Sequence, residues 1–192
     1  MSSLGSPNSF FLAGKKAYEV ERSLRFNSGD SPRLNFTASS SGNRKKWTKS
    51  WWIKRGNLDR VFITGYFING NNKAAVEFQS NGTLTIYNSV SGYLIQLVTN
   101  QVFRDTGAWF HLLINLDTAQ STASDRCKIY VNGVQVTSFS TATYPSQNAD
   151  LSFNQTVLEA IGTEGTNQAH HFDGYLAEIY FLDGYAYDPS YF

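Results

Sequence analysis

The chain has 192 residues, a length that suits one β-sandwich domain whose core needs no disulfide. Aromatic residues make up 15% and charged residues only 16% of the sequence, which excludes the low-hydrophobicity, high-charge profile of disordered chains. The net charge of +1 gives no global field that attracts nucleic acid. We therefore expect no nucleic-acid partner. No segment approaches about 20 consecutive apolar residues, so we also expect no membrane insertion.

Residues 1–20 differ from the rest of the chain because no strand or helix period is sustained in them. Their one apolar cluster is Phe10-Phe11-Leu12, and such a cluster is unfavourable in water. We therefore predict an extended N-terminal arm at residues 1–20 and a domain at residues 21–192. Phe10, Phe11 and Leu12 are the predicted assembly anchors of this arm.

The first long strand is predicted at residues 46–54, where side chains alternate between two faces. Trp47, Lys49, Trp51 and Ile53 share the face that we expect to lie in the core. Lys49 is an awkward member of that set, and either a snorkelling side chain or a bulge in the register would accommodate it. Trp52 has the opposite parity, so we expect it to be exposed or to lie against a partner.

Further β-rich runs follow, separated by turn residues at intervals of roughly 8–12 residues, which is typical of an antiparallel sandwich or barrel. Asn132-Gly133 predicts a two-residue hairpin of type I′. The one cysteine, Cys127, precedes a predicted strand and is interpreted as a buried, inert thiol. A single helical turn is predicted near Asp188 and Pro189. The runs lie at residues 61–68, 74–78, 83–87, 93–98, 108–116, 130–136, 157–161 and 175–182.

Four motifs in order resemble the laminin-G/pentraxin-like branch of the concanavalin A-like lectin and glucanase superfamily. They are Ser23-Leu24-Arg25-Phe26-Asn27; Thr48-x-Ser50-x-Trp52-x-Lys54; Trp109-x-His111 followed by Asp117 and Tyr130-Val131-Asn132-Gly133; and the closing segment from Phe172 to Phe181. This resemblance implies an all-β fold, an antiparallel β-sandwich of the jelly-roll type. Five segments are also similar to lectin-like domains in tailed-bacteriophage virion proteins, namely Arg22 to Asn27, Trp52 to Asn57, Val131 to Val134, Ala160-Ile161-Gly162 and Phe172 to Glu178.

Sugar binding would use aromatic rings that stack on a pyranose and amides that satisfy its hydroxyls. By composition and loop position, the glycan-binding candidates are Tyr66, Asn71, Asn72, Tyr93, Tyr144 and Asn167. The resemblance also implies a calcium ion at the rim of the sandwich, and calcium prefers six to eight oxygen ligands. Asp117 and Asp125 are the candidate calcium ligands, with polar residues that cap turns as the alternative interpretation.

Catalytic chemistry is not favoured by the acidic residues or the histidines. Glucanases of this fold need closely spaced acids on one strand, and the closest acid pair here, Glu19 and Glu21, lies at the junction of arm and domain. His111 is interpreted as a structural residue of a core-like strand. His170 and His171 are adjacent, and adjacent strand residues point to opposite faces, which disfavours a shared zinc ion.

These observations predict a non-catalytic protein of the bacteriophage particle surface, either a capsid decoration or a fibre subunit. Its domain would bind glycans on host or environmental surfaces, its arm would attach to other virion proteins, and we expect a homo-oligomer. One alternative is a structural cement protein that bridges coat subunits without binding sugar. A glycan hydrolase is the third hypothesis.

Overall fold

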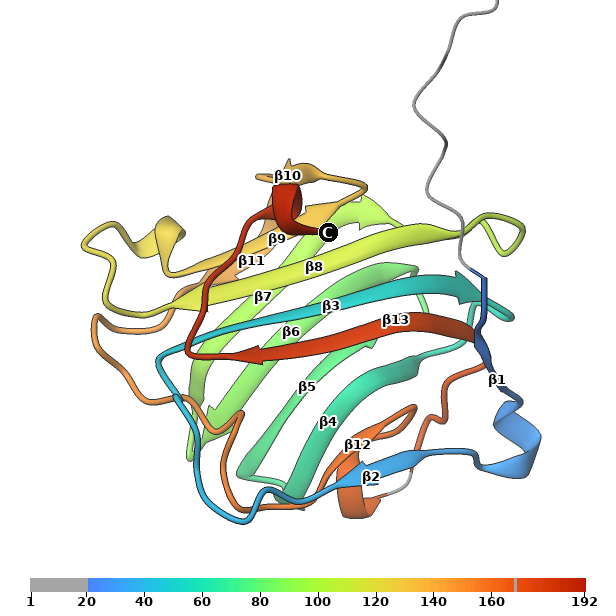
Figure 1. The fold of residues 1–192 in the computed structure, drawn as a ribbon, viewed down its shortest axis with the longest axis horizontal. Helices are drawn as coiled ribbons and strands as arrows, with labels where there is room; N and C mark the ends of the chain where they lie inside the picture. The colour runs from blue at the N-terminus through green and yellow to red at the C-terminus, as the bar shows by residue number, and fades with distance from the viewer. Residues whose placement is uncertain (1–20, 168) are drawn as a thin grey trace, which may run out of the picture.

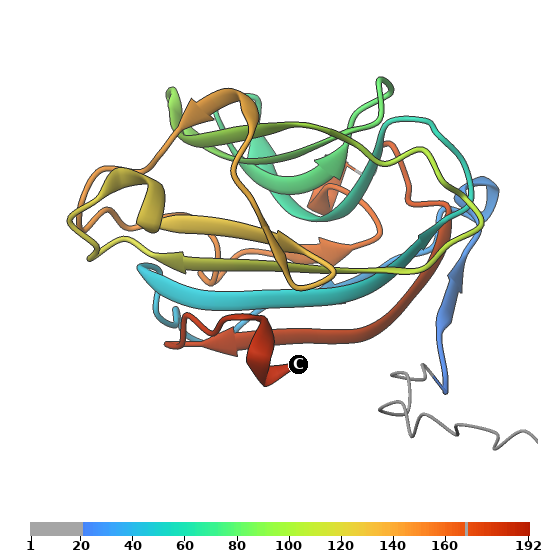
Figure 2. The same ribbon diagram turned by 90° about the horizontal axis from the view of Figure 1, so that it is seen from above.

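The computed structural model describes residues 21–167 and 169–192. The predicted arm, with Phe10, Phe11 and Leu12, lies outside the described residues. The described chain is built of β-strands and four short 3-10 turns, and they form the predicted antiparallel sandwich of two sheets. Figure 1 looks onto one sheet, and Figure 2 shows the two layers from above. No helix in the described ranges is long and apolar enough to cross a membrane.

The sheet nearer the viewer in Figure 1 has six antiparallel strands. In spatial order they are β1 (Leu24–Phe26), β13 (Gly174–Asp183), β3 (Lys46–Arg55), β8 (Phe110–Asp117), β9 (Cys127–Val131) and β10 (Val134–Val136). The second sheet has seven strands, namely β11 (Phe139–Thr143), β7 (Tyr93–Val102), β6 (Thr83–Val90), β5 (Asn72–Phe78), β4 (Val61–Asn69), β12 (Glu159–Ile161) and β2 (Leu34–Phe36). The 3-10 turns are η1 (Ser28–Asp30), η2 (Ala123–Asp125), η3 (Gly165–Asn167) and η4 (Pro189–Tyr191).

The core lies between the sheets and follows the alternation of each strand. On β3, Trp47, Trp51 and Ile53 are almost completely buried, as their shared parity predicts. Trp109 precedes β8, is half-buried, and its ring contacts Tyr175. Trp109 has the same parity as His111, which lines the outer face, and not that of the core residues Leu112 and Ile114, so its ring is not held between the sheets.

Lys49 faces the core and is only 3% exposed. It neither snorkels to water nor sits at a bulge of its own strand. Its ammonium group forms an ion pair with Glu159 of β12, in the other sheet, and lies 4.7 Å from the ring centre of Phe153 and 4.9 Å from that of Phe181. A buried cation is tolerated where a carboxylate and aromatic faces replace its hydration. Lys49 therefore connects the two sheets through a buried ion pair.

Local signals in the sequence are confirmed at three places. Asn132 and Gly133 have φ values of 50° and 80°, as a type I′ turn requires, between the paired residues Val131 and Val134. Cys127 is buried, and burial raises the pKa of its thiol to about 12. The predicted helical turn is η4, where the Asp188 carboxylate accepts a hydrogen bond of 2.8 Å from the backbone N–H of Ser190.

Candidate functional site

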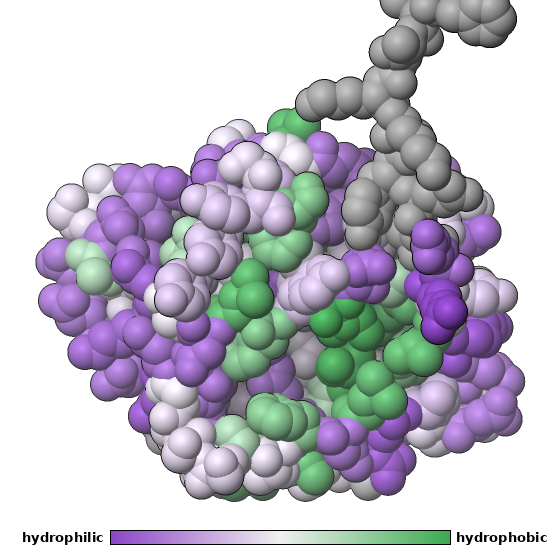
Figure 3. Space-filling model, in the orientation of Figure 1, coloured by the Kyte–Doolittle hydropathy of each residue, from purple (hydrophilic) through white to green (hydrophobic). Residues whose placement is uncertain are grey.

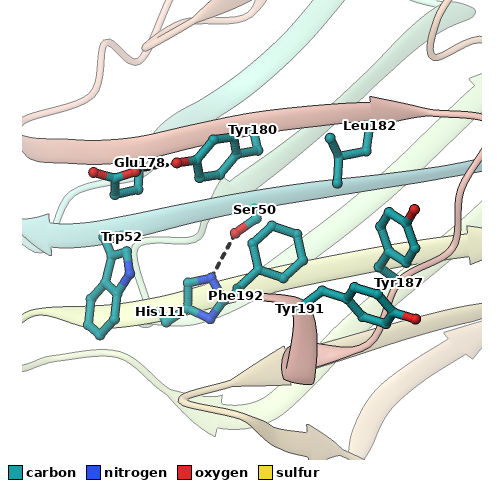
Figure 4. A pocket seen from close by; sticks show the side chains of 9 residues that line it. All are labelled: Ser50, Trp52, His111, Glu178, Tyr180, Leu182, Tyr187, Tyr191 and Phe192. Carbon is teal, nitrogen blue, oxygen red and sulfur yellow. Dashed lines mark hydrogen bonds between the residues drawn. The ribbon is translucent and has the colours of Figure 1, made fainter. Parts of the chain in front are cut away.

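An aromatic cleft of about 420 Å³ lies on the outer face of the six-stranded sheet (Figure 4). Strands β3, β8 and β13 form its floor with side chains that alternate with the core residues. The last residues of the chain form the opposite wall. The aromatic lining consists of Trp52, Tyr180, Tyr187, Tyr191 and Phe192, and the other lining residues are Ser50, His111, Glu178 and Leu182.

The C-terminal segment after β13 crosses this face of the sheet (Figure 1). Two outward-facing side chains hold it there. The hydroxyl of Thr48 donates to the carbonyl of Tyr185 over 2.7 Å and accepts from the N–H of Tyr187 over 2.8 Å. The side-chain amide of Asn115 donates to the carbonyl of Tyr187 over 2.9 Å. These bonds place η4, and with it Tyr191 and Phe192, beside the floor of the cleft.

The rings of the cleft contact one another at its centre. The ring of Phe192 lies 5.8 Å from that of His111 and 6.0 Å from that of Tyr180, and the ring of Trp52 lies 5.4 Å from His111 on its other side. Tyr180, Tyr191 and Phe192 remain 43%, 66% and 38% exposed. Aromatic surface of this kind is therefore both pre-positioned and accessible to a ligand.

Polar groups lie at the floor and rim of the same cleft. A hydrogen bond of 2.7 Å joins the Ser50 hydroxyl to Nε2 of His111, and both residues are buried. Burial lowers the pKa of His111, so its imidazole is neutral near pH 7. The Tyr180 hydroxyl donates to the Glu178 carboxylate at the rim. The cleft thus combines stacking surfaces with a few fixed hydrogen-bonding groups.

A second cavity, the polar groove, lies on the outer face of the seven-stranded sheet and has a volume of about 530 Å³. Its lining includes Arg60, Glu77, Thr85, Tyr87, Tyr93 and Gln96. Arg60 pairs with Glu77 at 2.8 Å, and the Tyr87 hydroxyl donates to Glu164 over 2.7 Å. Arg60, Glu77 and Tyr87 are thus already engaged, whereas the buried hydroxyl of Thr85 has no hydrogen-bond partner within the described residues, and the rim residue Tyr93 offers a half-exposed ring.

Glu77 of the groove lies near Glu164, an acid that the sequence does not place beside it. Burial raises the pKa of Glu77, Arg60 opposes that shift, and the charge of Glu164 adds to it. Glu77 is 2% exposed and Glu164 is 4% exposed. These carboxylates come from β5 and from the loop before η3, so they do not form the single-strand acid pattern of glucanases.

Three glycan candidates lie around the turn between β4 and β5. Tyr66 is 1% exposed, and its hydroxyl donates to the Asn72 side chain over 3.0 Å and accepts from Asn88 over 3.3 Å. Its ring is therefore part of the core and offers no face to a sugar, because Tyr66 lies on β4 among the residues that pack between the sheets. Asn72 is half-buried by the same contact, and Asn71 is exposed at the tip of the turn.

The remaining glycan candidates are not brought together. Tyr93 lies at the rim of the polar groove, where its ring contacts Tyr87 at 6.1 Å. Tyr144 is half-buried against the core cluster. Asn167 ends η3, and its side chain lies outside the described residues. No single cavity among those found in the described residues contains two of the six candidates.

The two calcium candidates have protein partners. Asp117 accepts hydrogen bonds from Gln120 and from the backbone of Ala119, and it pairs with Lys46 at 3.0 Å. Burial acts to raise its pKa, but these contacts outweigh burial and lower it. Asp125 pairs with Lys128 at 3.0 Å. Within residues 21–167 and 169–192, no three side chains of the His, Cys, Asp and Glu types are grouped to hold a metal ion.

The cleft residues were mostly missed by reasoning from sequence. Trp52 carried a signal, since its parity on β3 opposes that of the core residues. The cluster Tyr185, Tyr187, Tyr191 and Phe192 was also visible as four aromatics in the last eight residues. Their meeting depends on the C-terminal segment folding back over the sheet, which no local pattern predicts.

Comparison with known proteins identifies the fold family. No curated protein matches the sequence significantly. The structure is similar to domain 4 of an extracellular arabinanase from Geobacillus stearothermophilus in complex with arabinotriose, with a TM-score of 0.56 and 19% identity over 81% of this chain and 67% of that one. It is also similar to domains LG4-5 of the mouse laminin α1 chain, with a TM-score of 0.60 and 14% identity over 84% of this chain and 42% of that one.

A third similar structure is tailspike protein 2 from a bacteriophage of Escherichia coli O157:H7. The TM-score is 0.56 at 11% identity, and the match covers 84% of this chain but only 23% of the tailspike. At these identities the similarity concerns the fold alone. The sequence profile described as the concanavalin A-like lectin/glucanases superfamily matches residues 11–186, so the chain belongs to that superfamily.

Proposed function

We propose that this protein is a non-catalytic glycan-binding domain displayed on a bacteriophage particle, and that the aromatic cleft is its binding site. The observation that carries the proposal is the accessible set of rings fixed around His111 and Ser50 (Figure 4). Stacking of a pyranose needs aromatic faces that are held in place and not filled by the core. Ser50, His111 and Glu178 add hydrogen-bonding groups for sugar hydroxyls.

The aromatic cleft suits a sugar better than the polar groove does. At the groove, Arg60 pairs with Glu77 and Tyr87 bonds to Glu164, so a ligand that uses these groups would have to break an existing ion pair or hydrogen bond. In the cleft, Tyr180, Tyr191 and Phe192 are more than a third exposed before any ligand arrives. Binding there would cover apolar surface without such a loss.

The similar structures support a sugar ligand and a phage setting. The arabinanase domain is a complex with arabinotriose, and the tailspike is a phage protein. The sequence similarity to lectin-like virion domains points the same way. On the particle, the arm of residues 1–20 would contact other virion proteins, with Phe10, Phe11 and Leu12 as anchors, and the domain would face outward as part of a homo-oligomer.

A glycan array that includes arabinotriose, with the strongest binder then titrated by calorimetry, tests the binding site. Trp52→Ala and Tyr180→Ala should each weaken binding about tenfold or more, since removing a central aromatic contact typically costs at least about 1.4 kcal/mol. Trp109→Ala is the matched control, because Trp109 is a half-buried tryptophan outside the cleft. Equal losses in all three variants would refute the cleft as the site.

The array is run with calcium and again with EDTA. Binding that EDTA abolishes would move the site to the rim near Asp117 and Asp125. No binding in either condition would favour the structural cement function. Detection of the chain in density-purified particles of the phage that encodes it tests the virion assignment, and its absence from such particles would overturn that part.

Hydrolysis is a second candidate because Glu77, which lines the polar groove, lies close enough to Glu164 for the charge of Glu164 to raise its pKa. Incubation of the purified protein with the glycans that bind on the array, followed by chromatography of the products, tests it. We expect no products. Turnover that is lost in Glu77→Gln but kept in Glu178→Gln would establish an enzyme at the groove.

A further inference from the structure

An exposed apolar groove runs between the edges of the two sheets. It lies where β1 and β13 of one sheet approach β2 and β12 of the other, and green side chains gather over this region in Figure 3. Leu24, Leu34 and Phe36 are 47%, 45% and 59% exposed there. Exposed apolar surface in a continuous patch marks a place that another segment or molecule covers.

The groove consists of two adjoining cavities of about 320 and 600 Å³, which share Ile161 and Ile179. Phe36 and Phe181 line the first cavity, and Leu24, Leu34 and Leu176 line the second. On β2, Leu34 and Phe36 are two residues apart, so both side chains point to the same side of the strand. The groove is therefore a continuous and mostly apolar surface instead of scattered exposed residues, although Lys49, Glu159 and Glu178 are also among its lining residues.

Strand β2 is the last strand of its sheet and β1 is the last strand of the other, so both edges are open at this groove in the described residues. Open edges present unpaired backbone groups that can bind an extended segment. The same place thus offers apolar contacts along its floor and hydrogen-bonding groups along its sides. An extended peptide with adjacent apolar side chains fits this combination.

We propose that the occupant is the chain's own segment around Phe10-Phe11-Leu12. The described chain begins at Glu21, and the next residues, Arg22 and Ser23, already line the groove. About ten residues separate Leu12 from Arg22, and an extended stretch of that length reaches up to about 33–36 Å. The described chain therefore begins at the groove, and ten extended residues are long enough for Phe10-Phe11-Leu12 to reach along it.

Two further facts favour the chain's own segment. The superfamily profile matches from residue 11, so the sequence that belongs to the domain reaches into the arm. A short tether also gives the arm an effective local concentration in the millimolar range, which a second copy does not reach in dilute solution. The inference concerns the free protein and does not depend on glycan binding. On a particle, coat proteins would compete with the groove for the same three side chains.

Disulfide trapping in the full-length chain tests the proposal. The only native cysteine, Cys127, is 2% exposed and its thiol has a raised pKa, so it should not form disulfides with introduced cysteines. Phe11→Cys is combined with Leu34→Cys in the groove, and in the control with Val134→Cys. Val134 is 71% exposed on β10, at the opposite edge of the six-stranded sheet from β1.

Under mild oxidation, mass spectrometry should find an intramolecular disulfide between positions 11 and 34 at least about tenfold in excess of the control crosslink, as the local-concentration advantage predicts. Equal yields in the two double variants would overturn the proposal. A crosslink that joins two copies would show that the groove takes a neighbour's arm and would overturn the assignment to the same chain.

A second measurement does not depend on crosslinking geometry. Full-length protein with Phe10, Phe11 and Leu12 all changed to Ser should bind a hydrophobic dye such as ANS severalfold more strongly than the native chain, because the groove loses its cover. Circular dichroism checks that the variant keeps its β-sandwich. Unchanged dye binding by a folded variant would overturn the proposal.

Discussion

The two faces of strand β3 differ in what buries them. Trp47, Lys49 and Trp51 point between the sheets, where residues of both layers surround them. Thr48 and Ser50 point outward, yet they are 0% and 1% exposed. Distant parts of the chain account for this: Tyr185 and Tyr187 bond to Thr48, and His111 bonds to Ser50. The inner face is buried because the two sheets pack on each other. The outer face is buried by the C-terminal segment and by a side chain of the neighbouring strand.

Each face also holds one buried polar pair. Inside, the Lys49–Glu159 ion pair joins the two sheets. Outside, the Ser50–His111 hydrogen bond joins two neighbouring strands of one sheet and forms the floor of the aromatic cleft. The inner pair should therefore matter for stability, and the outer pair for ligand binding and its dependence on pH.

The largest expected difference comes from two tryptophans on opposite faces. Trp47→Ala should lower the free energy of unfolding by about 3–5 kcal/mol, because it leaves a cavity in a packed core. Trp52→Ala should cost less than half as much, because Trp52 is only half-buried, at the cleft, and not packed in the core. Chemical denaturation measures both, and similar losses would contradict the distinction between the faces.

The inner polar pair is tested next. Glu159→Gln should lower stability by about 3 kcal/mol, since it leaves the ammonium of Lys49 buried without a carboxylate. Adding Lys49→Met to that variant should recover most of the loss, because no buried charge then remains. Glu178→Gln on the outer face is the control and should change stability by less than about 1 kcal/mol. An equal effect of the two Glu→Gln changes would refute a special role for the inner pair.

Ser50→Ala removes one partner of the outer pair. The Nε2 atom of His111 then loses its hydrogen bond in a buried position, and we expect a loss of about 1–2 kcal/mol in unfolding free energy. The floor of the cleft loses a hydroxyl as well, so glycan affinity should fall in the same variant. A loss of stability with unchanged affinity would separate the pair from the binding site.

The smallest effect concerns pH. Burial lowers the pKa of His111 in the folded state, so the unfolded chain binds more protons between that lowered value and the usual value near 6.5. Stability is therefore full above about pH 6.5 and falls as pH drops through this window, by up to about 1.4 kcal/mol per pH unit.

Unfolding curves from about pH 7.5 to 5 measure this slope, which His111→Gln should flatten. His170 is the comparison, because burial, followed by the charge of Arg60, also lowers its pKa although the residue is exposed. His170→Gln should remove a smaller part of the slope. A slope that survives in His111→Gln would place the titrating group elsewhere.

The inner face of the sandwich was predictable because alternation along one strand decides it. The parity of Trp47, Trp51 and Ile53 places all three in the core, and Asn132-Gly133 specifies its own turn. The partner of Lys49 was not predictable, since Glu159 is far along the chain and in the other sheet. The family resemblance supplied the pairing of the layers that alternation alone leaves open.

The outer face was predicted poorly because contacts between distant segments of the chain determine it. The glycan candidates were selected by loop position and residue type, and Tyr66 was one of them. In the structure its ring is buried, and its hydroxyl bonds to Asn72 and Asn88. The selection overlooked Tyr180, Tyr191 and Phe192, whose positions depend on bonds from Thr48 and Asn115 to the C-terminal segment. Contacts between distant segments leave no periodic signal in either one.

The pairing of β13 with β3 has a consequence for how related sequences should vary in length. Ala177 lies opposite Trp52 and Tyr180 opposite Ser50, so two residues, Glu178 and Ile179, face the single position of Trp51. Glu178 has a φ of 46°, a conformation in which a non-glycine residue is strained. A relative that lacks one residue here would keep every pair on both sides of the gap. Among homologues, single-residue deletions in this strand should therefore concentrate at this bulge and be rare elsewhere along it.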